Sequence, residues 1–143
     1  MNIAQIIFRK ECPGFCAYYW FITDSDRLPI ATKEMIETEE HVFVSIASFW
    51  EMAIKESLGK LKLPAMIKEL MEDCTEYEFS ILPINGMHLN RIKNLPFIHR
   101  DPFDRILICQ AQEEDLTIVT VDSNIMKYDV MTIWNSSQSP IDK

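Results

Sequence analysis

One stretch, residues 99–122 (HRDPFDRILICQAQEEDLTIVTVD), constrains the fold more than any other part of the sequence. Asp101 followed by Pro102 suits a helix N-cap with proline at the first helical position, and an apolar helix is predicted after them. Residues 116–121 form a continuous apolar, mostly β-branched run, which is typical of a strand covered on both faces of a parallel sheet. Asp122 then stands at the carboxyl end of this strand, where open α/β sheets bind ligands.

The rest of the chain alternates between strand-like and helix-like segments. Strands are predicted at residues 3–8, 41–46, 79–84 and 130–134, and helices from Pro29 to Thr38, from residue 47 to near Gly59, after Pro64 and after Asn85. Pro83 favours an edge position for the third of these strands. This order predicts an α/β fold with a mainly parallel sheet and helices on both faces. We expect one domain over residues 1–134 and a frayed polar tail over residues 135–143.

The composition is that of a globular protein, with 48% hydrophobic residues and a net charge of −8. This charge argues against a generic basic nucleic-acid binder, but it leaves a nuclease possible because clustered carboxylates bind divalent cations. The apolar runs are shorter than the roughly 20 residues that span a bilayer, so no membrane association is expected. The four cysteines form no C-x-x-C pair, and Cys109 is expected in the core. We therefore expect a cytoplasmic protein whose thiols are reduced.

Three acidic residues are candidate site groups, and each also has a purely structural interpretation. Glu51 fits a capping box with Ser48, but if the helix begins at Ser45 it lies nearly two turns in and is able to face a crevice. Asp104 lies in a first helical turn, where a negative charge complements the helix dipole, and Asp122 is a natural first residue of a turn. Like charges placed together are usually tolerated where a cation offsets them, and oxygen ligands favour Mg²⁺ or Mn²⁺ over zinc.

Several residues near these carboxylates have weaker signals. A solvated loop is the default for His99 and Arg100. In a nuclease, Arg100 or Arg105 would hold a phosphate, and His99 would orient a neighbouring carboxylate. Trp50 is predicted to lie in the core.

Together, three ordered segments resemble a PIN-domain protein of the VapC toxin type: WE-x-A-I-K-x-S-x-G-K-L, then H-R-D-P-F-D-R, then V-T-x-D, within residues 20–134. The resemblance implies an α/β/α domain with a short parallel sheet and a metal-dependent endoribonuclease that uses Mg²⁺ or Mn²⁺. It implies catalytic and metal-binding roles for Glu51, Asp104 and Asp122, with Asp101 as an N-cap or supporting group. It also implies an RNA substrate, a cognate antitoxin protein and a homodimer.

The amino terminus departs from this pattern, so residues 1–16 are atypical. Family members begin with a strand running into Asp-Thr-His shortly before a W-F-I segment. That segment is present from Trp20, but the position of the first aspartate falls at Gly14. Residues 3–8 with Glu11 as a substitute carboxylate are one explanation, and a shifted reading frame or altered start is another. The resemblance therefore implies weakened or absent activity, with a catalytically inactive PIN-like module that binds antitoxin or its own copy as the alternative.

Overall fold

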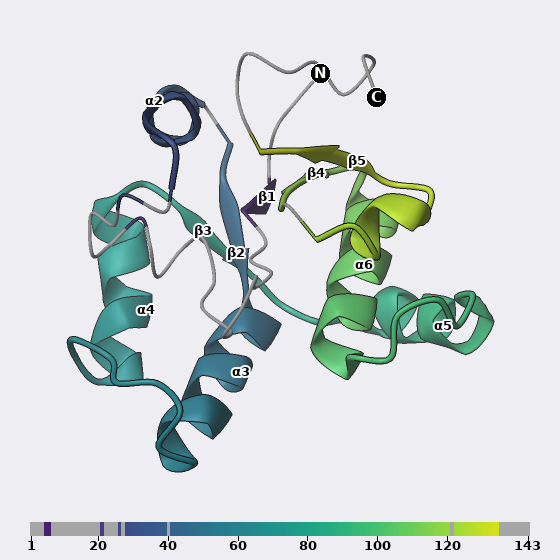
Figure 1. The fold of residues 1–143 in the computed structure, drawn as a ribbon, viewed down its shortest axis with the longest axis horizontal. Helices are drawn as coiled ribbons and strands as arrows, with labels where there is room; N and C mark the ends of the chain where they lie inside the picture. Colours follow the sequence, from purple (N-terminus) through teal and green to yellow (C-terminus); the bar gives the residue numbers. More distant parts are fainter. Residues whose placement is uncertain are drawn as a thin grey trace.

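The computed structural model describes residues 5–6, 21, 26, 28–39, 41–120 and 122–134. Within these ranges, five short parallel strands form one sheet in the order β3-β2-β1-β4-β5 (Figure 1). The strands are β1 (Gln5–Ile6), β2 (Phe43–Ser45), β3 (Ser80–Leu82), β4 (Thr117–Val119) and β5 (Met131–Ile133). The predicted α/β class with a parallel sheet is confirmed, and β3, which precedes Pro83, is an edge strand as expected.

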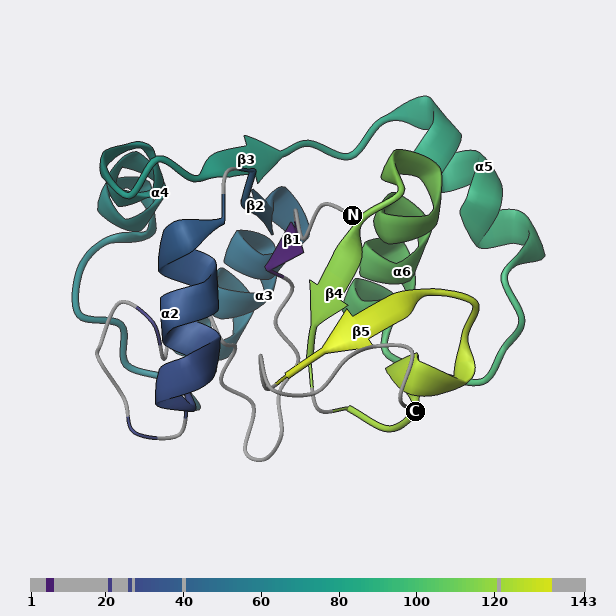
Figure 2. The same ribbon diagram turned by 90° about the horizontal axis from the view of Figure 1, so that it is seen from above.

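Helices cover the two faces of the sheet in two groups, which Figure 2 shows on opposite sides of the strands. The helices are α2 (Ile30–Thr38), α3 (Ile46–Ser57), α4 (Ile67–Glu76), α5 (Gly86–Asn94) and α6 (Pro102–Glu114), with a short 3₁₀ helix η1 (Ile125–Lys127) before β5. The core divides at β4, because Ile118 packs with the α6 cluster and its neighbour Val119 packs with the α2 and α4 cluster. No helix of the described segments is both long and apolar enough to cross a membrane.

The start of α3 decides between the two interpretations of Glu51. Ser45 is the N-cap, and its side-chain oxygen accepts a hydrogen bond from the Ala47 backbone N–H at 3.0 Å. The helix therefore begins at Ile46, and Glu51 lies too far along it to be a capping residue. The capping box with Ser48 is wrong, and the alternative, a Glu51 placed beyond the first turn, is the correct one.

The start of α4 corrects another expectation, because this helix does not open at Pro64. Leu61 and Leu63 alternate into the core, so the chain is still extended where the proline follows. The helix begins only after Met66, whose backbone N–H donates to Glu69 Oε1 at 3.2 Å. A side chain inside the helix therefore sets the boundary, rather than the proline before it.

Trp50 was expected in the core, and this is also wrong. Phe49 and Met52 take the inward positions on α3, whereas Trp50 faces outward with 59% of its surface exposed. Its ring packs edge-on against Phe103 of α6 with 5.1 Å between centroids. Trp50 therefore belongs to the surface beside the amino-terminal end of α6.

The strand predicted within residues 3–8 is confirmed as β1, at the centre of the sheet. Gln5 pairs with Phe43 of β2 on one side and with Ile118 of β4 on the other. The positions of Glu11 and Gly14, and the tail over residues 135–143, lie outside the described residues.

Candidate metal centre

Asp104 reaches the site from the first turn of α6. The side chain of Asp101 caps this helix, its Oδ1 accepting the Phe103 backbone N–H at 2.8 Å, and Pro102 follows as predicted. Capping fixes the direction in which the helix leaves the loop and so places Asp104 on the inner face, where it is fully buried. A carboxylate at this depth loses its hydration and is retained only where positive charge or hydrogen-bond donors compensate.

Asp122 reaches the same point from the end of β4. Its backbone N–H donates to Thr120 Oγ1 at 3.0 Å, and its Oδ1 accepts the Asn124 backbone N–H at 2.8 Å. The structural interpretation, in which Asp122 begins a turn, is thus correct for one carboxylate oxygen. The other oxygen, Oδ2, faces His99.

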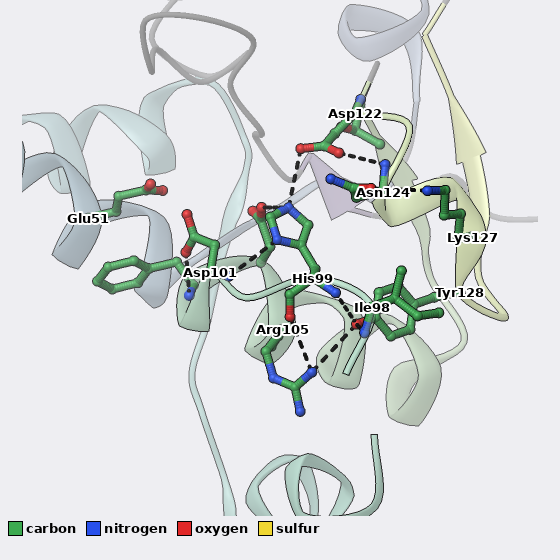
Figure 3. Close-up of polar contacts among 12 residues, drawn as sticks. Glu51, Ile98, His99, Asp101, Arg105, Asp122, Asn124, Lys127 and Tyr128 are labelled. Atoms are coloured by element: carbon green, nitrogen blue, oxygen red, sulfur yellow. Dashed lines mark hydrogen bonds and ion pairs between the residues drawn. The ribbon is translucent and has the colours of Figure 1, made fainter. Parts of the chain in front are cut away.

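His99 lies between the two aspartates, and Figure 3 shows its ring beside Asp122. Its Nε2 is 2.6 Å from Asp104 Oδ2 and 3.4 Å from Asp122 Oδ2. Its Nδ1 accepts the Asp101 backbone N–H at 3.2 Å. Because an accepting ring nitrogen carries no hydrogen, the ring hydrogen is on Nε2 and is directed at the two carboxylates. Ligand atoms from His99, Asp104 and Asp122 all lie within 4.8 Å of one another.

The loop that carries His99 is held by Arg105 and Tyr128. The Tyr128 hydroxyl accepts the backbone N–H groups of Ile98 at 3.0 Å and His99 at 2.8 Å, and donates to the Pro96 carbonyl at 2.7 Å. The Arg105 guanidinium donates to carbonyls of the same loop, those of Leu95, Pro96 and His99. Arg105 therefore contacts the loop backbone, and its guanidinium donors are engaged by the loop carbonyls.

Sequence reasoning missed Tyr128 and the binding mode of Arg105. Nothing in the local pattern around Tyr128 distinguishes it from an ordinary apolar residue before a strand. The one available signal is that Arg105 falls inside an apolar helical segment, where an arginine is buried only if carbonyls or acids receive its donors.

Glu51 lies apart from the three-residue cluster. Its Oε2 is 3.1 Å from Lys55 Nζ, one turn further along α3. Glu51 and Asp101 line the same hollow, of about 420 Å³, and Figure 3 shows both carboxyl groups on the α3 side of His99. Of the three predicted acidic residues, the structure thus brings Asp104 and Asp122 together with His99, and leaves Glu51 at the edge of the adjacent hollow.

Cys109 lies on α6 behind the site and is buried, as predicted. Burial raises the pKa of its thiol to about 11, and the positive charges of Arg105 and Arg91 offset part of this effect. The thiol is therefore protonated at neutral pH and is a core group rather than a ligand or nucleophile.

The donor set of the cluster is suited to a small divalent cation. Two carboxylates converge within 4.8 Å of each other and of His99, whose Nε2–H faces both of them, and one of the carboxylates is fully buried. Carboxylate oxygens are the ligands that Mg²⁺ and Mn²⁺ prefer, and a cation would offset the repulsion between Asp104 and Asp122. The residues present therefore fit such a metal.

The fold and this site together define a parallel α/β domain with a carboxylate centre at the exit of its strands. Residues 16–131, most of the chain, match the PIN domain family, and the chain belongs to that family. Membership indicates a nuclease-type function, and PIN domains are generally nucleases that depend on divalent metals. Comparison with curated proteins finds no match.

Proposed function

We propose that this chain is a metal-dependent endoribonuclease of the VapC toxin type, weakened or inactive in the form given by its sequence. The observation that supports this most is the convergence of His99, Asp104 and Asp122 within 4.8 Å in a PIN domain. The segments that resemble VapC toxins include the residues that form this cluster. An RNA substrate, a cognate antitoxin protein, a homodimer and a cytoplasmic location follow from the same proposal.

Each residue near the cluster has a role in this proposal. Asp104 and Asp122 hold Mg²⁺ or Mn²⁺, and Glu51 completes the set from α3 after it exchanges its contact with Lys55. When bound, such a metal lowers the pKa of a coordinated water and neutralises charge on the phosphate. His99 orients the two aspartates through Nε2, and the Asp101 backbone N–H fixes the ring in the tautomer that this requires.

Weak activity follows from the missing first aspartate. With Gly14 at that position, the site has one carboxylate fewer than the family pattern, so a bound cation has less opposing charge and looser geometry. A shifted reading frame before residue 17 would produce the same departure from the family pattern, and resequencing the coding DNA tests this explanation.

The direct test is RNA cleavage by the purified protein in Mg²⁺ and in Mn²⁺, combined with calorimetric titration of Mn²⁺. We expect weak Mn²⁺ binding, slow or absent cleavage, and loss of binding in Asp104→Asn. Asp129→Asn is a matched control, because this aspartate is exposed and lies outside the cluster. Robust turnover that Asp104→Ala abolishes would contradict the proposed weakness. Absence of Mn²⁺ binding at millimolar metal concentration would exclude a metal-dependent nuclease function for this chain.

A catalytically inactive PIN-like module is the alternative, and the absence of the first aspartate favours it. Such a module would still bind an antitoxin or a second copy of itself. Expression in bacteria separates the two functions, because only an active toxin arrests growth. Relief of that arrest by a co-expressed neighbouring gene would identify the antitoxin.

A further inference from the structure

The hollow beside α3 combines positive charge with apolar surface. Its lining contains three basic and two acidic residues, whereas the whole chain has 14 basic and 22 acidic residues. The lining residues are Glu51, Ile54, Lys55, Leu58, Lys60, Arg100, Asp101, Pro102 and Phe103. Positive charge is therefore concentrated here relative to the rest of a strongly acidic protein.

Aromatic surface adjoins this charge. Phe103 lines the hollow, and the exposed Trp50 packs edge-on against its ring. Within the described residues, no ion pair involves Lys60 or Arg100, so both cations are available to an anionic ligand. A volume of about 420 Å³ lies in the range of roughly 300–1,000 Å³ that is usual for small-ligand sites.

We propose that this hollow binds one nucleotide unit of a single-stranded RNA. The phosphate lies against Lys60 and Arg100, and the base lies against Phe103 and Trp50. The inference rests on the proposed ribonuclease function and adds the surface that holds the substrate. An unpaired strand fits better than a duplex, because only unstacked bases expose a face to aromatic side chains.

The position of the hollow supports RNA over a peptide. Glu51 and Asp101 line it on the side of His99, so a bound strand would continue toward the carboxylate cluster (Figure 3). A peptide docked on the apolar residues alone would leave Lys60 and Arg100 without a function. A phosphodiester backbone uses the cations and brings its next phosphate toward Asp104 and Asp122.

The test is binding of a fluorescent oligouridylate of about 12 nucleotides, within the usual range for single-strand sites, measured by anisotropy in EDTA so that no metal-dependent cleavage occurs. Lys60→Gln and Arg100→Gln should each weaken binding about threefold to tenfold and lower the salt slope by about 0.7. Trp50→Ala should weaken binding about tenfold through loss of stacking, and Trp50→Phe should restore most of it. Lys68→Gln on α4 is the matched control, because it removes the same charge outside the hollow.

Failure of this inference is distinguishable from failure of the proposed function. If the wild type cleaves RNA in Mn²⁺ while the hollow variants keep wild-type affinity, the hollow is not the substrate site and the nuclease stands. If the wild type does not bind RNA in EDTA, the hollow proposal is overturned, and the proposed function is overturned as well only if Mn²⁺ binding is also absent. If Trp50→Ala converts a dimer to a monomer in sedimentation and leaves RNA affinity unchanged, the surface is a contact between copies instead.

Discussion

The two flanks of the candidate centre are built in different ways. On one flank, the loop that carries His99 is tied to buried groups, with Arg105 and Tyr128 bonding its backbone. On the other flank, the buried Glu51 pairs with Lys55 one turn further along α3, and its neighbour Trp50 is exposed. The first flank is thus closed by buried donors and acceptors, whereas the second borders the exposed ring of Trp50.

This difference indicates a division of labour. The buried flank holds His99, Asp104 and Asp122 in one geometry before any ligand arrives, which is what a cation site requires. The α3 flank presents the exposed side chain of Trp50, which suits a surface that receives a long, variable partner. Stability should therefore depend strongly on the first flank, and ligand binding should depend on both.

Among the residues that flank the centre, the largest effect is expected from Arg105→Met. The change leaves three loop carbonyls without their charged donor, so we expect a loss of about 2–4 kcal/mol of unfolding free energy. Urea denaturation measures it. The matched control is Arg91→Gln, which breaks an exposed pair with Glu113 and should cost less than about 1 kcal/mol. Equal losses of unfolding free energy in the two variants would contradict the interpretation that the buried Arg105 holds the His99 loop in place.

A somewhat smaller effect is expected from Tyr128→Phe. Removal of the hydroxyl leaves the N–H groups of Ile98 and His99 without their acceptor and should cost about 1–3 kcal/mol. Because the His99 loop then loosens, Mn²⁺ affinity in calorimetry should fall as well. Tyr77→Phe, on a half-exposed tyrosine, controls for loss of a hydroxyl and should change neither quantity. A stable variant with unaltered Mn²⁺ affinity would show that the loop needs no such support.

The structural features that depend only on neighbouring residues could be predicted from the sequence. The capped helix after Asp101 and the turn at Asp122 depend on neighbouring residues, so both were identified without a structure. The role of Tyr128 depends on contacts with a loop about 30 residues earlier, and no local pattern encodes it. Trp50 was misassigned because helical periodicity predicts a buried face but does not show how far that face extends. The position of Glu51 relative to the cluster likewise depends on how α3 packs against α6.

On the α3 flank, Trp50→Ala should lower the unfolding free energy by less than about 1 kcal/mol, because the side chain is already exposed. Its neighbour Phe49 is the internal comparison. Phe49→Ala creates a core cavity and should cost about 3–5 kcal/mol in the same urea measurement. A large loss from Trp50→Ala would show that this flank is structural after all.

The smallest expected effect is the pH dependence of stability that arises from Cys109, which is buried on α6. Its thiol has a pKa raised to about 11 in the fold, so between pH 9 and 11 the unfolded chain loses a proton that the folded chain keeps. Stability should therefore fall as the pH rises through this window. Urea denaturation across the window should show a smaller fall in Cys109→Ala, and identical slopes would show that other groups cause it.

The central position of β1 has a consequence for how the protein is made. Gln5 is synthesised long before Ile118, so it must wait for that residue before its second neighbour exists. In the sheet of the described residues, the pairs β2–β3 and β4–β5 are joined through this two-residue strand. A polypeptide initiated downstream of it would emerge as two half-sheets with open inner edges, exposed to aggregation and proteases.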